Sequence, residues 1–260
     1  MPTAPVHHEL NLTAQDVLTY GSWALTFVLI GVAVVMCRKE RTPFYLFVVL
    51  AAMVAAFAEP LYDVATMLYF YSTDGMQTHF TAFDIPQPVW THSGYAVLYA
   101  APALAITRKI RQGTLTRSAL FAWAGVVFAM SCAFEMIGIN GGAYTYWGPY
   151  ELRLFRYPLV IGVLEAAQVT LFAVAASQLR ERVKNPVGLL GLFVLFPMTF
   201  YAVNFGAGAP LIIALHLEDT TSTIVLLGTL LSIVCAAVVI RGASLFLPTV
   251  PRREPSGGAA

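Results

Sequence analysis

The chain has 260 residues, of which 58% are hydrophobic and 11% are charged, and its formal net charge is +1. A soluble domain carries about 25% charged residues, so the composition excludes an ordinary soluble protein. The near-zero net charge gives no reason to expect a nucleic-acid partner. Long apolar segments match the thickness of a bilayer core, and the short alternating segments of a transmembrane barrel are missing.

Seven apolar segments predict an all-α membrane protein, a bundle of seven transmembrane helices. The expected spans are residues 20–37, 43–71, 89–107, 118–137, 158–179, 186–205 and 220–240. The chain is therefore expected to have three parts. They are a polar N-terminal segment (1–18), a seven-helix transmembrane domain (19–247) and a disordered C-terminal tail (248–260) that is rich in Pro, Gly and Arg.

The basic residues gather at one end of the predicted spans. Of the 15 Lys and Arg, all but Arg153 and Arg156 flank the ends of the first, third, fifth and seventh spans. Because cytoplasmic loops carry an excess of Lys and Arg, we expect the N-terminus outside and the C-terminus in the cytoplasm. The connection after the fourth span holds aromatic residues typical of the headgroup level. They are Tyr144, Tyr146, Trp147, Tyr150, Phe155 and Tyr157.

The second span holds two carboxylates, Glu59 and Asp63, which are four residues apart and so share one face of a helix. A carboxylate in hydrocarbon is unfavourable unless it is protonated, paired or facing a wet cavity. This pair therefore predicts a functional site. Pro60 lies between the two acids and removes a helical hydrogen bond, so we expect a kink that opens the helix there.

Polar side chains of four other spans lie at the same outer depth, which predicts a cavity toward the outer leaflet. We expect four catalytic acids: Glu59, Asp63, Glu165 and Glu135. We expect substrate contacts from His92, Tyr95, Asn204, Trp90, Tyr62, Gln168 and Asp219. Asn204 equally suits hydrogen bonds between helices, and His92 equally suits a structural role. Asp219 equally suits the cap region of the last helix.

Several chemistries are excluded by their missing motifs. The chain has no P-loop, dinucleotide fingerprint, zinc-protease helix or nucleophile elbow. The three cysteines are far apart, which excludes a closely spaced metal site. Lys39, Lys109 and Lys184 all lie at the basic end, so the last span offers no lysine for a retinal Schiff base. We therefore expect no cofactor and no metal, and general acid–base chemistry by carboxyl groups in an apolar cavity.

Three segments resemble a known family. They are EPLYD at 59–63, FTAFDIPQPVW at 80–90 and the Gly- and Tyr-rich GAYTYWG at 142–148. The first two are similar to the EPLxD and FTAFGxPxPxW segments of the AveC-like spirocyclases, which are actinobacterial membrane proteins. Asp84 stands where that pattern has glycine. The resemblance covers roughly residues 45–160 and implies a multi-pass protein of the bacterial inner membrane.

The resemblance implies a cyclase that closes a dihydroxy-ketone polyketide into a spiroketal, with dehydration in some members. For this reaction we expect Glu59 and Asp63 to be the acid/base pair. The orienting or proton-sharing partners would be Glu165, Glu135, His92 and Asn204. Two alternatives stay open: a membrane terpene cyclase that protonates an epoxide or alkene, and a small proton-coupled transporter. The expected partners are a hydrophobic small-molecule substrate and the lipid bilayer, and the oligomeric state stays open.

Overall fold

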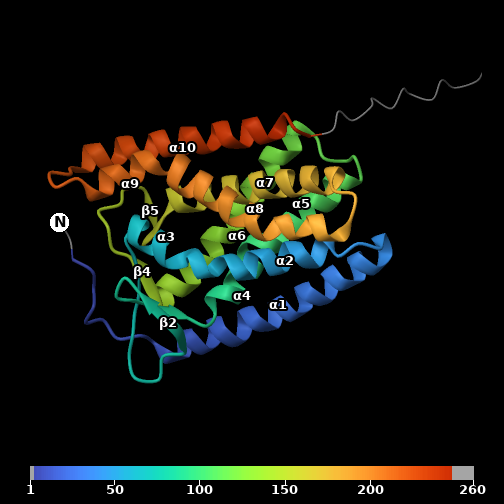
Figure 1. Ribbon diagram of the computed structural model, residues 1–260. Coiled ribbons are helices and arrows are strands. Elements are labelled where there is room, and N and C mark those ends of the chain that lie inside the picture. The colour runs from blue at the N-terminus through green and yellow to red at the C-terminus, as the bar shows by residue number, and fades with distance from the viewer. Residues whose placement is uncertain (1–2, 248–260) are drawn as a thin grey trace, which may run out of the picture.

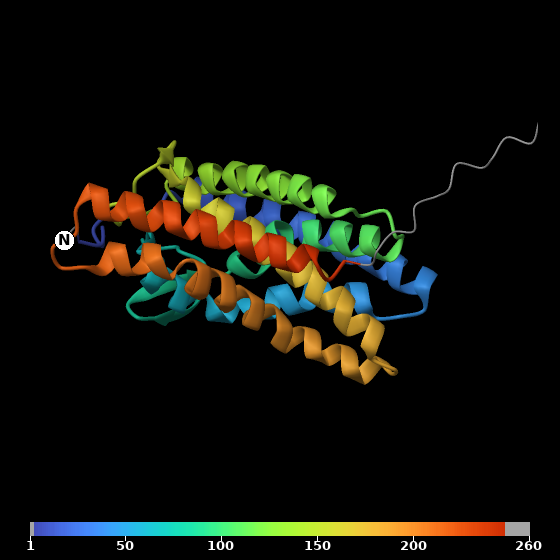
Figure 2. The same ribbon diagram turned by 90° about the horizontal axis from the view of Figure 1, so that it is seen from above.

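The computed structural model describes residues 3–247, and the predicted tail at 248–260 lies outside the described residues. Long helices run side by side along one common direction (Figure 1, Figure 2). Six of them are long and apolar enough to cross a membrane. Their bounds are Leu12–Glu40, Phe44–Thr66, Arg117–Gly141, Leu159–Arg182, Pro186–Ala207 and Ser222–Ser244. The protein is therefore a mainly helical, multi-pass membrane protein.

Several of the long helices are built from shorter segments. In chain order the helices are α1 (Leu12–Glu40), α2 (Phe44–Ala55), η1 (Ala56–Ala58), α3 (Glu59–Thr66), α4 (Thr91–Tyr95), η2 (Ala96–Ala100), α5 (Ala101–Arg111), α6 (Arg117–Gly141), α7 (Leu159–Arg182), η3 (Pro186–Gly191), α8 (Leu192–Tyr201), η4 (Ala202–Ala207), α9 (Ala209–His216) and α10 (Ser222–Ser244). η1 and η3 are 3-10 helices, and η2 and η4 are π-helical. π-helical turns occur frequently at functional sites. The parts of the bundle around η2 and η4 are therefore candidate functional sites.

Helix α7 is the centre of the bundle. Most of its side chains are buried, whereas most of α1 is exposed. Helices α5, α6, α8 and α10 all pack against α7, and Figure 1 shows α7 among them. The sequence of α7 is apolar on every side, which is typical of a helix surrounded by others.

The second span is interrupted and ends earlier than expected. The α-helix gives way to η1 directly before Pro60, as the proline predicts, because proline cannot donate the helical hydrogen bond. The prediction that this span runs to residue 71 is wrong. Met67 takes a left-handed conformation that ends α3, and the next residues form a strand.

The connections contain three two-stranded antiparallel sheets, which the all-α prediction omits. The pairs are β1 (Leu68–Phe70) with β4 (Tyr144–Tyr146), β2 (Thr78–Ala82) with β3 (Ile85–Pro88), and β5 (Arg153–Leu154) with β6 (Tyr157–Pro158). The β2–β3 hairpin turns at Phe83 and Asp84, both with positive φ (52° and 60°). Glycine adopts this conformation without strain, which is a physical reason for the glycine of the resembling pattern at position 84.

The sixth span bends where Gly and Pro predict a break. The backbone N–H of Gly208 donates to the carbonyl oxygen of Val203 (2.9 Å), which closes the π-helical segment η4. A Cβ atom at Gly208 would overlap the carbonyl oxygen of Asn204, so glycine is required there. The chain then continues as a helix, α9, rather than as a loop.

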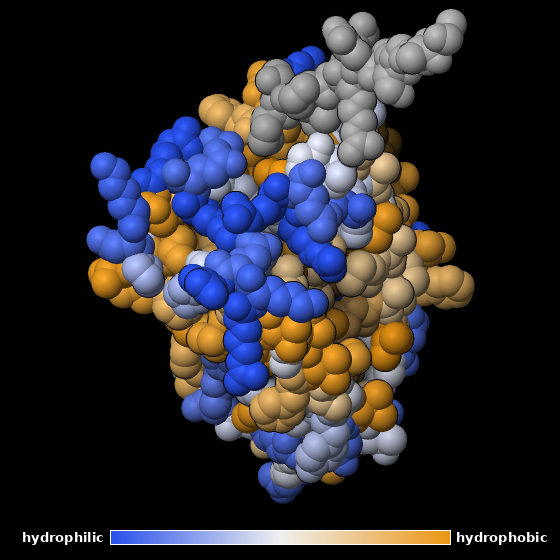
Figure 3. Space-filling model, turned by 90° about the vertical axis from the view of Figure 1, so that its right-hand side faces the viewer, coloured by the Kyte–Doolittle hydropathy of each residue, from blue (hydrophilic) through white to orange (hydrophobic). Residues whose placement is uncertain are grey.

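Three helix ends are joined at the end of the bundle opposite the sheets. Oε2 of Glu40 on α1 accepts from Arg111 on α5 and from Arg180 on α7, each at 2.6 Å. The Arg180 guanidinium also lies 4.8 Å from the centre of the Phe44 ring. Figure 3 looks onto this end and shows hydrophilic side chains gathered there beside apolar ones. This network fixes the basic end of the bundle.

Candidate active site

Three carboxylic acids from three helices line one buried cavity. Glu59 is the first residue of α3, Glu135 belongs to α6 and Glu165 belongs to α7. All three side chains are buried. The cavity has a volume of about 30 Å³, whereas one water molecule needs about 10–15 Å³. As it stands, the cavity has room for small polar groups but not for a large molecule.

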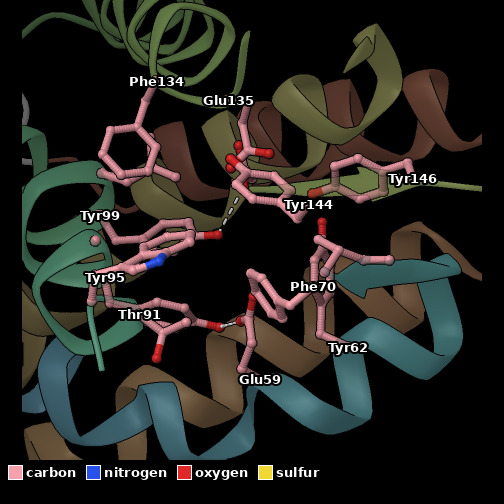
Figure 4. A pocket seen from close by; sticks show the side chains of 15 residues that line it. Glu59, Tyr62, Phe70, Thr91, Tyr95, Tyr99, Phe134, Glu135, Tyr144 and Tyr146 are labelled. Atoms are coloured by element: carbon pink, nitrogen blue, oxygen red, sulfur yellow. Dashed lines mark hydrogen bonds between the residues drawn. The ribbon is translucent and has the colours of Figure 1, made fainter. Parts of the chain in front are cut away.

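Aromatic side chains form most of the cavity wall. Figure 4 shows Glu135 and Tyr144 on one side of the cavity and Glu59 and Tyr62 on the other. The remaining residues of the wall are Leu68, Phe70, Trp90, Thr91, Gly94, Tyr95, Leu98, Tyr99, Phe134, Tyr146 and Glu165 itself. Phe134 is half-buried, whereas the others are buried. The side chain of Phe134 therefore separates the cavity from the outside of the bundle.

Hydroxyl groups donate to two of the three acids. Tyr95 Oη donates to Oε2 of Glu59. Oε1 of Glu165 accepts from Tyr99 Oη at 2.8 Å. Oε2 of Glu165 accepts from Ser131 Oγ and from Tyr157 Oη, the latter at 3.2 Å. Among the three acids, Glu165 thus has both oxygens occupied by donors, an arrangement that supports a negative charge.

The third acid, Glu135, differs from the other two. Its Oε2 is buried without a hydrogen-bond partner among residues 3–247, and so are Tyr62 Oη and Tyr144 Oη. All three residues line the cavity. Buried polar groups are almost always hydrogen-bonded, so these three oxygens mark the place where water or a polar group of a ligand would bind.

Local structure explains how the tyrosines reach the cavity. Tyr95 and Tyr99 are four residues apart on the α4–η2 helix, and their rings pack at 4.8 Å. Tyr144 and Tyr146 alternate with Thr145 on β4 and are buried on the same side of that strand. A Cβ atom at Gly138 would overlap the Tyr144 ring, so α6 carries glycine where this ring packs.

The tyrosines of the connections are held in their neutral form. Burial raises the pKa of Tyr144 and of Tyr146 well above the usual value. Burial likewise raises the pKa of Tyr157, with Glu165 adding to it. These phenols therefore remain hydrogen-bond donors at any physiological pH. Tyr144, Tyr146 and Tyr157 are buried inside the bundle and do not face the surrounding lipid.

Six of the predicted site residues meet at this cavity. They are Glu59, Glu135, Glu165, Tyr62, Trp90 and Tyr95. Asp63 is fully buried but lies outside the lining. Its Oδ2 accepts from Gln87 Nε2 on β3 at 2.7 Å. The other oxygens of this pair, Asp63 Oδ1 and Gln87 Oε1, are buried without a partner.

The other four predicted residues lie elsewhere. His92 Nδ1 contacts the carbonyl oxygen of Met53 (2.7 Å), and His92 Nε2 contacts His79 Nδ1 (3.1 Å). Asn204 donates to the carbonyl oxygen of Phe200 (3.0 Å). Gln168 is buried without a side-chain partner. Asp219 is exposed between α9 and α10. The shared outer depth of these residues did not place them at one cavity, because depth does not define which face of a helix a side chain occupies.

Five residues around the acids lie outside the predicted site. Tyr99, Ser131 and Tyr157 donate to Glu165, and Tyr144 and Tyr146 line the cavity. Two signals in the sequence pointed to them. Tyr95 and Tyr99 have the spacing of one helix face, and Tyr144-Thr145-Tyr146 has the alternation of a strand.

Comparison with protein families, curated proteins and solved structures finds no match for this chain.

Proposed function

We propose that the chain crosses the bacterial inner membrane seven times, with its N-terminus outside and its C-terminus in the cytoplasm. The seventh span would be Thr91–Arg111, the continuous run of α4, η2 and α5, which is not among the six long apolar helices. Its support is the distribution of charge. Arg108, Lys109 and Arg111 end this run at the same end as Glu40, whose carboxylate pairs with both Arg111 and Arg180. Under this topology the acid cavity lies in the outer half of the membrane.

We further propose that the protein is a cofactor-free cyclase that uses intramembrane carboxylic acids on a hydrophobic, polyketide-like substrate. The observation that carries this proposal is the cavity itself. Three acids share it, two of them accept from tyrosines, and unpartnered oxygens of Glu135, Tyr62 and Tyr144 face it. General acid–base chemistry needs a proton donor and a proton acceptor within reach of one substrate. The resemblance to the AveC-like spirocyclases supports spiroketal formation, with dehydration as a related outcome.

The hydrogen bonds assign different roles to the three acids. Oε2 of Glu135 is buried and accepts no hydrogen bond from the described residues, so Glu135 would hold a proton and act as the general acid. Oε2 of Glu59 accepts from Tyr95 Oη, which supports the ionised form, so Glu59 would take up a proton on its other oxygen as the general base. Glu165 accepts three hydrogen bonds and would carry the negative charge that stabilises a cationic intermediate. Asp63 would position strand β3 through Gln87 rather than touch the substrate.

The proposed reaction starts from a linear dihydroxy-ketone whose first hydroxyl has added to the ketone to give a hemiketal. Glu135 gives its proton to the hemiketal hydroxyl. The C–O bond to this group then breaks, and the loss of water produces an oxocarbenium ion. The second hydroxyl attacks this carbon, forms the new C–O bond and loses its proton to Glu59. The products are the spiroketal and one water molecule. Transfer of that proton from Glu59 to Glu135 restores the site, with no oxidant, reductant or metal required.

Access to the site would pass Phe134. A polyketide is much larger than the cavity of about 30 Å³, so a side chain of the wall must move to admit it. Phe134 is the half-buried member of that wall, and it packs opposite Gly94, where a Cβ atom would come within 3.6 Å of the Phe134 ring. The neighbouring Ile137 is 60% exposed, so this face of α6 would meet lipid. A hydrophobic substrate would enter from the membrane between α4 and α6.

The aromatic wall also favours a second candidate, a terpene cyclase that protonates an epoxide or alkene. Phe70, Trp90 and Tyr144 pack against one another with ring centres 5.5–5.7 Å apart. Aromatic faces attract cations, so this wall would stabilise a carbocation as well as an oxocarbenium ion. The same acids would serve both reactions, and the substrate distinguishes them.

Incubation of the purified protein with a linear dihydroxy-ketone and, separately, with an epoxy-terpenoid tests the proposal. Product formation is followed by mass spectrometry for the wild type, for Glu59→Gln and for Glu218→Gln, a control at an exposed connection. We expect the wild type and the control to convert the dihydroxy-ketone and Glu59→Gln to lose the activity. Conversion of the epoxy-terpenoid alone would favour the second candidate. Conversion of either substrate by Glu59→Gln at the wild-type rate would show that Glu59 has no proton-transfer role.

A further inference from the structure

A groove lies between α1 and α5 near the basic end of the bundle. Toward its other end, α1 is held against α4 by Ser22 Oγ and Ser93 Oγ (2.7 Å) and by Thr26 Oγ1, which donates to the carbonyl oxygen of Ser93 (3.2 Å). Direct contacts between α1 and α5 are few. The groove between them has a volume of about 570 Å³. It is separate from the acid cavity and shares no lining residue with it.

The wall of the groove is an apolar stripe on α1. It consists of Val28, Gly31, Val32, Val35 and Met36. Spacings of three and four residues place them on one helix face. The three valines are 48–66% exposed, and a Cβ atom added at Gly31 would meet no other atom within 4 Å. The stripe is therefore open along its length to an apolar ligand.

Two cations stand at the mouth of this groove. Lys39 on α1 and Arg108 on α5 are exposed, and their side chains form no ion pair or hydrogen bond with any residue in 3–247. Glu40 also lines the mouth, but Arg111 and Arg180 already contact its carboxylate at 2.6 Å. The unmatched charge at the mouth is therefore positive.

We propose that this groove binds one anionic phospholipid, with an acyl chain along the stripe of α1 and the phosphate between Lys39 and Arg108. Basic sites between transmembrane helices recognise anionic headgroups. A free phosphate would contact the two cations and leave the apolar wall uncovered, whereas a phospholipid covers both. The bound lipid would fill the gap between α1 and α5 and join α1 to the rest of the bundle. This site is independent of the proposed cyclase activity.

Native mass spectrometry of the detergent-purified protein, titrated with phosphatidylglycerol, tests the charged part of the site. The variant is Lys39→Gln with Arg108→Gln. The control is Arg117→Gln with Lys184→Gln, which removes the same charge from exposed positions outside the groove. An attraction of about 1 kcal/mol per cation near the headgroups predicts affinity about fivefold weaker per cation, or about 25-fold for the pair. Wild-type affinity in the first variant, or an equal loss in the control, would overturn the proposal.

A second pair of variants tests the apolar part. Gly31→Leu places a side chain in the groove, at a position where an added Cβ atom meets no other atom within 4 Å. Gly21→Leu adds the same side chain to α1 at another open position outside the groove. We expect Gly31→Leu to weaken phosphatidylglycerol binding and Gly21→Leu to leave it unchanged. Wild-type affinity in Gly31→Leu, or full competition by inorganic phosphate, would show that no acyl chain lies in the groove. Equal affinity for phosphatidylcholine would contradict the preference for an anionic headgroup.

Discussion

Replacement of Asp63 distinguishes a positioning role from a catalytic one. Asp63 and Gln87 are fully buried and share one hydrogen bond, from Gln87 Nε2 to Asp63 Oδ2 at 2.7 Å. The two oxygens left over, Asp63 Oδ1 and Gln87 Oε1, have no partner. One proton on Asp63 Oδ1, donated to Gln87 Oε1, would satisfy both and close a ring of two hydrogen bonds between acid and amide. In that state Asp63 is neutral, and asparagine reproduces its hydrogen bonds.

The expected change in the free energy of unfolding follows from the hydrogen-bonding groups that each variant leaves unpaired. Asp63→Asn forms both hydrogen bonds of the neutral ring with Gln87, so we expect little change in the free energy of unfolding. Asp63→Ala leaves the buried amide of Gln87 without any partner, which costs about 1–3 kcal/mol. For a protein of this size the loss lowers the thermal midpoint by roughly 2–12 °C, at about 2–4 °C per kcal/mol.

Thermal unfolding in detergent, followed by tryptophan fluorescence, measures this difference. The comparison uses wild type, Asp63→Asn and Asp63→Ala, with Gln87→Ala as a matched loss of the other partner. We expect Asp63→Asn to match the wild type and the two alanine variants to fall by similar amounts. If Asp63→Asn is as unstable as Asp63→Ala, then Asp63 needs its charge and the neutral ring is wrong. If it is stable but inactive, Asp63 belongs with the catalytic acids.

Three further predictions concern the hairpin and the cavity wall. Phe83→Asn should raise the free energy of unfolding by about 1 kcal/mol, because asparagine accepts a left-handed conformation that is unfavourable for phenylalanine; a denaturation series with a lower midpoint would contradict this. Burial lowers the pKa of His79, and His92 adds to the effect, so stability should be lost as the pH falls through about 6.5. Between about pH 7.5 and 5.5, the thermal midpoint of the wild type should then fall more than that of His79→Gln. An equal decrease in both proteins would contradict this prediction. Phe134→Ala should speed turnover of bulky substrates in a steady-state assay, whereas Ile137→Ala on the same face should not; equal rates would exclude access past Phe134.

The apolar segments predict the long helices because a bilayer demands about 20 apolar residues with internally satisfied backbone groups. The same reasoning extended the second span to residue 71, since Leu68, Tyr69 and Phe70 are apolar. Only the structure shows that Met67 ends the helix and that these residues pair with β4. Such pairing joins segments far apart in sequence, and no local pattern predicts it.

The sequence predicts that buried acids share a cavity, but it does not predict which residues line that cavity. Buried carboxylates in apolar helices require partners, which correctly directs attention to Glu59, Glu135 and Glu165. Which face each helix turns inward depends on packing around α7. For this reason Asp63, one turn from Glu59, meets Gln87 instead of the other acids, and Tyr144 enters the cavity from a strand.

The proposed activity is proton transfer to and from a hydrophobic substrate by the acids of one buried cavity. The most direct measurement is the rate of spiroketal formation from a linear dihydroxy-ketone by purified Glu135→Gln, beside wild type and the exposed control Glu218→Gln. General acid catalysis contributes about 10²- to 10⁴-fold, so we predict a loss of at least about 100-fold for Glu135→Gln and none for the control. A Glu135→Gln protein that folds normally and forms the spiroketal at the wild-type rate would show that Glu135 is not the general acid.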